Sequence, residues 1–168
     1  MSQLRCGAID EYGRLQPFQG ACALSHATFG RWLLALLCGM QGIGTLAIDL
    51  NRTHATNPVW LRHARFHLVW QAISYALLSV LEVALILAPG SFQEQRFYLA
   101  AILAVIPMLS CLAAALSCKF YGGALSDPSG IQPARVRLFS SEFHVDMNVA
   151  AEVLALTMLC LIVAFYRC

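Results

Sequence analysis

Charged side chains are scarce in this 168-residue chain, where Asp, Glu, Lys and Arg together make up 12% of the residues. An average soluble domain carries about 25% charged residues. Hydrophobic residues make up 59%, and a soluble fold with so little charge could not cover its own surface. The composition therefore excludes a soluble enzyme and a disordered tail. The formal net charge of +2 is too small to indicate binding to a polyanion, so nucleic acid is not an expected partner.

The seven cysteines include no C-x-x-C pair. Nothing in their spacing supports a redox relay or a structural zinc knuckle. Three of them, Cys38, Cys111 and Cys160, lie in apolar runs, where a free cysteine behaves as a small hydrophobe. We therefore expect neither a complete disulfide framework nor a metal centre built on cysteine.

Four apolar runs are the main feature that the chain does have, and they cover about residues 29–49, 66–88, 97–117 and 144–166. Each is close to the ~20 residues that a helix needs to cross a bilayer. Because backbone groups in hydrocarbon must pair internally, the runs are expected to be helices. The sequence thus predicts an all-α integral membrane protein, with a single domain over residues 1–168 built as a four-helix transmembrane bundle. Residues 1–26 lack the features of a cleavable signal peptide, so the first run is expected to direct insertion.

The connections between these runs differ in length. Residues 89–91, Pro-Gly-Ser, form a short turn, so the second and third helices are expected to be antiparallel neighbours. Residues 119–146 form a long loop, of a length that is usually functional or mobile. Nearly equal numbers of Lys and Arg fall on the two sides of the membrane, which leaves the orientation open.

Polar residues recur at helical spacing in three of the runs. In spanning helices such residues tend to face the bundle interior, so the three stripes are expected to converge on one interior pocket. They are Gln41, Thr45 and Asp49 in the first run, His67, Gln71, Ser74, Tyr75 and Glu82 in the second, and His144, Asn148 and Glu152 in the fourth.

Two roles are open for these residues. Hydrogen bonding between helices is the simpler role, and we favour it for Gln41, Thr45, Ser74 and Ser110. For Asp49, His67, Glu82 and Glu152 we favour function, because ionisable groups inside a bundle are expensive as mere structural contacts. We expect Asp49, His67 and Glu152 to line one enclosed pocket.

His63 and His67 are four residues apart, a spacing that can hold a metal ion, with His54, His144 or Asp49 completing the ligand set. No Glu stands between them as in H-E-x-x-H, and no second H-x-x-x-H occurs. We therefore expect no metal. A general acid–base role for His67 fits better, since imidazole titrates near neutrality.

Residues 44–71 carry a resemblance to a known family. Residues 44–50 read GTLAIDL, Pro58 and Trp60 follow, and residues 66–71 read FHLVWQ. This pattern resembles the EXPERA group of four-to-five-helix membrane proteins, which includes the emopamil-binding sterol isomerases and the sigma-2 receptors. In the sigma-2 branch an aspartate ends the first helix, as Asp49 does, and a glutamate stands where this chain has His67. The isomerase branch opens the same helix with His-x-x-x-Glu, to which His63-x-x-x-His67 is similar with histidine in place of glutamate.

The resemblance implies a pocket for a sterol or terpenoid and an isomerase or cyclase that moves protons without a cofactor. His67 or His63 would donate the proton, Asp49 or Glu152 would stabilise the carbocation, and tryptophan rings would add cation–π support. The candidate catalytic residues are His67, Asp49, His63 and Glu152. The candidate ligand-binding residues are Trp60, Trp70, Gln71, Tyr75, Glu82, His144, Asn148 and Gln41.

Two other function classes are open. The first is a non-catalytic sterol- or lipid-binding protein in which Asp49 pairs with a polar head group. The second is a membrane assembly subunit that uses its helix faces. The expected partners are a hydrophobic small molecule, the lipid bilayer and, as one option, a second copy of the chain. The expected location is a membrane, the endoplasmic reticulum if the source is eukaryotic.

Overall fold

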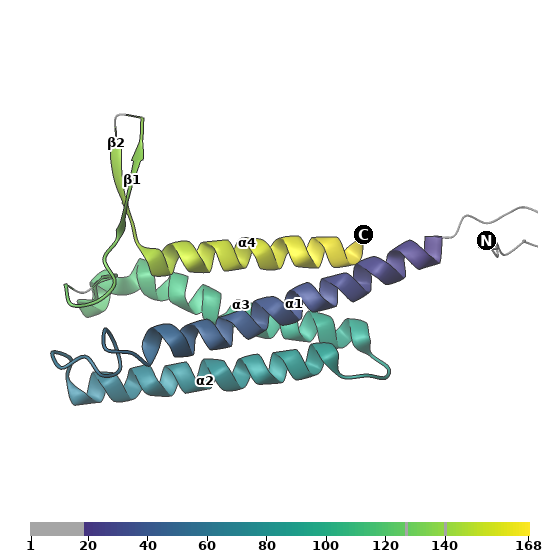
Figure 1. The fold of residues 1–168 in the computed structure, drawn as a ribbon, viewed down its shortest axis with the longest axis horizontal. Coiled ribbons are helices and arrows are strands. Elements are labelled where there is room, and N and C mark those ends of the chain that lie inside the picture. Colours follow the sequence, from purple (N-terminus) through teal and green to yellow (C-terminus); the bar gives the residue numbers. More distant parts are fainter. Residues whose placement is uncertain (1–18, 127, 140) are drawn as a thin grey trace, which may run out of the picture.

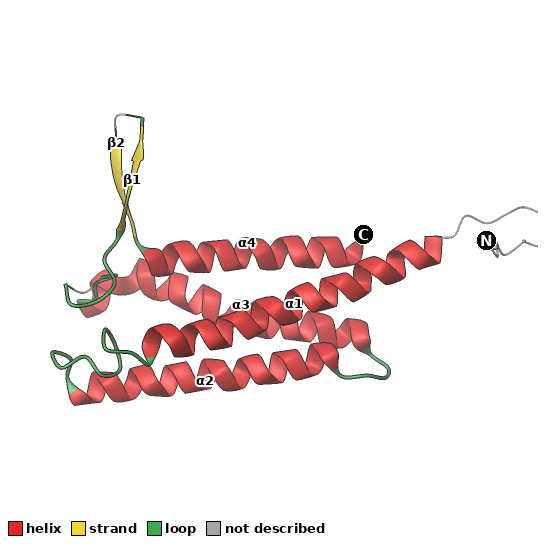
Figure 2. Cartoon of the chain, viewed as in Figure 1, coloured by secondary structure: helices red, strands yellow, loops and turns green. Residues whose placement is uncertain are grey.

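Four long helices dominate the computed structural model, which describes residues 19–126, 128–139 and 141–168 (Figure 1). A short 3₁₀ helix and two short strands connect the third helix to the fourth (Figure 2). The elements are α1 (Gln19–Asp49), α2 (Arg62–Leu87), α3 (Gln93–Ser117), η1 (Cys118–Tyr121), β1 (Ala134–Leu138), β2 (Ser141–Val145) and α4 (Met147–Arg167). All four α-helices are long and apolar enough to cross a membrane, so by length and composition the chain fits a multi-pass membrane protein. At this level the prediction of four spanning helices is confirmed.

Successive helices run in opposite directions (Figure 1), and the contacts between them close a ring. α1 packs against α2 and α4, and α3 packs against the same two helices, whereas α1 and α3 contact each other little. The short connection between α2 and α3 defines one end of the bundle, which we call the turn end. The opposite end carries residues 50–61 and the whole segment between α3 and α4, and we call it the linker end.

All four helices begin at other residues than predicted, and α2 and α3 each begin four residues earlier, at Arg62 and Gln93. α1 begins at Gln19 and not near residue 29, because residues 20–28 include three alanines and a leucine, all strong helix formers, and no proline. α4 begins at Met147 and not at residue 144. The Asp146 carboxylate accepts hydrogen bonds from the backbone N–H groups of Asn148 and Val149, both at 3.0 Å, and this N-cap sets the start of the helix.

The segment between α3 and α4 is not the structureless loop that the sequence suggested, so the fold is not purely helical. β1 and β2 pair antiparallel, with Ala134 opposite Val145 and Leu138 opposite Ser141. Alternating charged and β-branched or aromatic residues favour a strand over a helix here. The hairpin projects away from the bundle at the linker end (Figure 1).

The hydrophobic core fills the bundle from the turn end to its middle. Leu34, Phe97 and Met108 are completely buried there. The Phe97 ring stacks on Tyr166 of α4 with centroids 3.7 Å apart. Arg31 donates a hydrogen bond from Nε to the carbonyl of Ile86 at 3.0 Å, which satisfies one of the free carbonyls at the end of α2.

Two glycines allow close helix contacts in this part of the bundle. A Cβ atom added at Gly42 would lie 2.6 Å from the Cβ of Ser79 on α2. One added at Gly30 would lie 3.1 Å from the Tyr166 ring on α4. Small residues at such crossings let helix backbones approach closely in a membrane. The tight packing stops short of the linker end, where the helices leave space between them.

Candidate functional site

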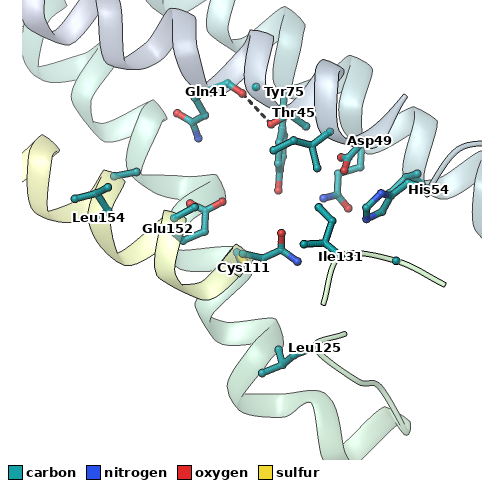
Figure 3. Close-up of a pocket in the computed structure, with 18 of the residues that line it drawn as sticks. Gln41, Thr45, Asp49, His54, Tyr75, Cys111, Leu125, Ile131, Glu152 and Leu154 are labelled. Atoms are coloured by element: carbon teal, nitrogen blue, oxygen red, sulfur yellow. Dashed lines mark hydrogen bonds between the residues drawn. The ribbon is translucent and has the colours of Figure 1, made fainter. Parts of the chain in front are cut away.

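A cavity of about 850 Å³ lies between the helices at the linker end (Figure 3). Its volume is within the range of roughly 300–1,000 Å³ typical of small-molecule sites. Toward the middle of the bundle the walls are apolar and include Leu37, Met40, Ala155 and Met158. The polar side chains of the lining are Gln41, Thr45, Asp49, His54, Trp60, Gln71, Tyr75, Cys111, Ser126, Asn148 and Glu152.

The polar stripe of α1 faces this cavity along its whole length. Gln41, Thr45 and Asp49 follow one another at intervals of four residues and all line the wall. Thr45 Oγ1 donates to the carbonyl of Gln41 at 2.8 Å, so the hydroxyl hydrogen is already used within the helix. The side-chain amide of Gln41 is buried, and neither its oxygen nor its nitrogen has a hydrogen-bond partner among the described residues. This amide can therefore donate to and accept from a bound molecule.

Two carboxyl groups from different helices face the same cavity. Asp49 ends α1, and Glu152 lies in the second turn of α4. Neither side chain makes a hydrogen bond or an ion pair with another residue of the described part of the chain. Figure 3 shows the Tyr75 side chain of α2 between the two carboxyl groups. The cavity thus presents two acids and a phenol with unused hydrogen-bonding capacity against an otherwise apolar wall.

His54 adds an imidazole to this group, because the chain folds back after α1. The backbone N–H of Ala55 donates to the carbonyl of Asp49 at 3.0 Å. Asn51 holds the turn, since its Oδ1 accepts from the Thr53 N–H at 2.8 Å. Figure 3 shows the resulting position of His54 beside Asp49. Its ring meets Trp60 edge to face with centroids 5.5 Å apart, and both residues line the cavity.

Asn57 ties together the two segments that border the cavity at the linker end. Its side chain is 2% exposed. Nδ2 donates to the carbonyl of Thr53 and to Ser129 Oγ, both at 3.0 Å. Oδ1 accepts from the backbone N–H of Val59 at 3.1 Å. These bonds connect the linker after α1 to the loop that supplies Gly130 and Ile131 to the cavity lining.

His67 does not line the cavity, so the expectation that it joins Asp49 and Glu152 there is wrong. Its side chain is exposed, and its Nε2 lies 3.0 Å from Nε2 of His63 on the outer face of α2. At about 100° per residue, His67 points roughly 140° away from Ala72, one of the four buried residues of α2. Polar residues near a helix end reach the head-group region, so their pattern does not mark the buried face of α2.

Trp70 also lies on this outer face. Its side chain is 60% exposed. With Phe66, Val69 and Ile73 it lines a separate shallow groove of about 350 Å³. Neither Trp70 nor His63 belongs to the lining of the main cavity.

Glu82 faces inward but does not reach the cavity either. It is 1% exposed and lies two helical turns beyond Tyr75, within the tightly packed part of the bundle. Its neighbour across the α1–α2 contact is Cys38, whose backbone carbonyl accepts a hydrogen bond from Ser79 Oγ at 2.6 Å. Glu82 Oε1 has no hydrogen-bond partner in the described part of the chain.

His144 belongs to β2, opposite Arg135, and not to α4. Its side chain is exposed, and it is absent from the cavity lining. The N-cap at Asp146 separates it from the helix, so the predicted stripe on α4 is reduced to Asn148 and Glu152, which both line the cavity.

The sequence patterns did not identify some of the lining residues as ligand contacts. His54 and Cys111 are the main ones, together with the loop residues Leu125 and Ile131. Cys111 lies on α3 in an apolar run with no polar stripe to identify its inward side. The loop residues depend on contacts between linkers that are 72 positions apart in the chain, as in the Asn57–Ser129 bond.

No group of three or more His, Cys, Asp or Glu side chains in the described residues is arranged to hold a metal ion. Searches of the chain against protein-family models, curated proteins and solved structures return no match.

Proposed function

We propose that the chain is a multi-pass membrane protein that binds an amphipathic polycyclic or isoprenoid molecule, of the sterol or terpenoid class, in the cavity between its helices. The observation that carries the proposal is the pair of unpaired carboxyl groups, Asp49 and Glu152, on the wall of a mostly apolar cavity of about 850 Å³. Leaving such groups unpaired inside a bundle is costly. A ligand that supplies a hydroxyl or a cationic group would remove that cost.

The arrangement of the lining also gives the ligand a direction. The apolar body would lie toward the middle of the bundle, beside Leu37, Met40 and Met158. The polar head would lie toward the linker end, where Asp49, His54 and Trp60 gather. Burial of the apolar body would supply most of the affinity, at about 25 cal/mol per Å² of apolar surface, and the polar groups would select the head.

The resemblance of residues 44–71 to EXPERA proteins agrees with this proposal at Asp49. It does not extend to His67, which the resemblance aligns with a ligand-pairing glutamate and which faces away from the cavity. As part of the proposal we place the protein in that group, and in the endoplasmic reticulum membrane if its source is eukaryotic. The proposal needs no cofactor and no metal.

The decisive experiment is mass spectrometry of the lipids that co-purify with the protein in nanodiscs. We expect a sterol or terpenoid at close to one molecule per chain. Asp49→Asn and Glu152→Gln should each lower its occupancy, because each removes a negative charge and an acceptor from the cavity wall. Glu94→Gln makes the same change on an exposed residue of the first turn of α3 and should leave occupancy unchanged. Purification with ordinary phospholipids alone would refute the proposal.

A second candidate function is an acid–base isomerase or cyclase acting on the same ligand. The specific observation in its favour is that Asp49, His54 and Glu152 border one cavity, so a proton donor and a proton acceptor are both available. In this version His54 replaces His67 as the histidine of the site. One group would protonate a double bond of the ligand, and another would remove a proton from the neighbouring carbon of the cation.

Incubation with the co-purified lipid in deuterated water separates the enzyme from the carrier. An isomerase would place deuterium on ligand carbon, and His54→Ala or Asp49→Asn should slow incorporation by about 10²–10⁴-fold, the usual contribution of a general acid or base. His67→Ala should leave the rate unchanged. Absence of deuterium in a ligand-loaded wild-type protein would leave binding as the function.

A further inference from the structure

The hairpin of β1 and β2 has two chemically different faces. Side chains alternate between the faces of a strand pair. The register places Val136 opposite Phe143 on one face, with Ala134 and Val145 beside them. On the other face it pairs charged or polar residues, which are Arg135 with His144 and Arg137 with Glu142. The hairpin is therefore amphipathic.

Nothing in the described part of the chain covers the apolar face. Val136 is 44% exposed and Phe143 is 52% exposed. Phe139, at the tip, is 96% exposed and has a positive φ of 55°. Each strand makes extended contacts with its partner strand and not with the helices. Because an isolated two-stranded hairpin is at best marginally stable in water, its apolar face needs another surface.

The position of the hairpin relative to the bundle identifies that surface. β2 ends at Val145, and the apolar span of α4 begins at Met147. The base of the hairpin is thus at the level where the chain enters the membrane. Figure 1 shows the hairpin projecting from the side of the bundle, across the direction of the helices. If the helices cross the bilayer, the hairpin lies along the bilayer surface, in the plane of the head groups.

The charge of this end of the molecule complements anionic head groups. Arg135 and Arg137 lie on the polar face of the hairpin, and the Arg137 side chain is 79% exposed. Glu142 approaches Arg137 at 4.0 Å and offsets only part of this charge. Four further basic residues lie at the same end of the bundle, and they are Arg52, Arg62, Arg65 and Lys119. Basic clusters next to membrane spans attract anionic lipids.

We propose that the β1–β2 hairpin is an interfacial lipid-binding element. Its apolar face, with Val136 and Phe143, lies on the acyl chains at the membrane boundary. Arg135 and Arg137 bind the phosphate groups of anionic phospholipids in the same leaflet. The assignment is independent of what the main cavity binds, because no described residue of the hairpin lines that cavity.

The test uses the full chain in phosphatidylcholine nanodiscs with a photo-crosslinking residue, p-benzoylphenylalanine, in place of Phe143 on the apolar face or Glu142 on the polar face. We expect the probe at position 143 to form several times more lipid adducts than the probe at 142. Equal lipid yields at the two positions, or no lipid adduct at 143, would overturn the proposal. So would a predominant adduct at 143 to a second copy of the chain.

The charge of the polar face is tested in nanodiscs with and without phosphatidylserine. Phosphatidylserine should raise the adduct yield at position 143 severalfold in the background with Arg135 and Arg137. The increase should persist in the double variant Arg135→Lys, Arg137→Lys, which keeps both charges, and disappear in Arg135→Gln, Arg137→Gln. An undiminished increase in the glutamine variant would overturn the anionic-lipid part of the proposal.

Discussion

Asn57 determines at the level of a single residue how the cavity is bounded at the linker end. It is a buried side chain that uses both its donor and its acceptor atoms. Buried amides are stabilising only when satisfied, and removing one leaves its partners unpaired at a cost of about 1–3 kcal/mol. Asn57 is also the residue whose side chain joins two linkers that are far apart in sequence. Its loss would therefore affect the site more than the helices.

Asn57→Ala should loosen the linker without unfolding the bundle. Amide hydrogen exchange of residues 50–60 should speed up, because the bonds to Thr53 and Val59 are lost. Ligand occupancy should fall by up to about tenfold, as 1.4 kcal/mol corresponds to a factor of ten in affinity. The comparison variant is Gln95→Ala, on an exposed position of α3. Unchanged exchange in residues 50–60 would show that Asn57 does not hold the linker.

At the scale of elements, the contact between α1 and α2 determines how closely the helices approach. A Cβ atom added at Gly42 would lie so close to the Cβ of Ser79 that one of the two helices would have to shift. The neighbouring bond from Ser79 Oγ to the Cys38 carbonyl fixes the register of the two helices. Gly39 is on the same helix and has no atom within 4 Å of where a Cβ would lie. Alanine substitutions at these two glycines therefore distinguish the effect of packing on stability from the effect of helix propensity.

Gly42→Ala should destabilise the protein, and Gly39→Ala should not. Forcing a methyl group into a packed contact costs about 1–3 kcal/mol, which exceeds the gain of up to about 1 kcal/mol in helix propensity. At Gly39 only the gain applies. Thermal unfolding in detergent should show a lower Tm for Gly42→Ala than for the wild type. Equal Tm values for the two variants would mean that the helices are not in contact at Gly42.

Sequence patterns identified the helices better than they identified the inward face of each helix. A spanning helix needs about 20 apolar residues, so hydropathy alone reveals it. On α1 and α4 the polar residues at the linker end, such as Asp49 and Glu152, do lie on the inward side. On α2 the expectation that polar residues face the bundle interior was wrong for His67, because a polar residue near the membrane surface is not forced inward. The cavity boundary depends on contacts between linkers, which no periodicity encodes.

At the scale of the whole molecule, much of the apolar surface of the described residues is not covered by any other described part of the chain. In the most apolar 18-residue stretch of α4, only 6% of the residues are buried. Large apolar side chains such as Val153, Leu154 and Leu161 remain exposed. Such an extended apolar surface, in a chain with so few charges, fits helices that face lipid.

Cysteine labelling in nanodiscs checks this arrangement. Cys160 is exposed in the second half of α4, whereas Cys118 lies at the start of η1, at the linker end. A water-soluble maleimide should modify Cys118 but leave Cys160 protected until the protein is denatured, because lipid excludes both the reagent and the thiolate form. Site-resolved mass spectrometry distinguishes the two thiols. Modification of Cys160 as fast as Cys118 would place the outer face of α4 in water.

The core fills the bundle only from the turn end to its middle, so we expect the remaining part of α1 to tilt like a lever about its contact with α2. The Gly42–Ser79 contact acts as a fulcrum, and Asp49 lies seven residues beyond it, about 10 Å along the helix at 1.5 Å per residue. A tilt of about 5° at the fulcrum therefore moves Asp49 by about 1 Å across the cavity mouth. We expect the tightly packed half to deform little, so that a wider or narrower ligand of the proposed class would be accommodated by a change in this opening angle and not by repacking.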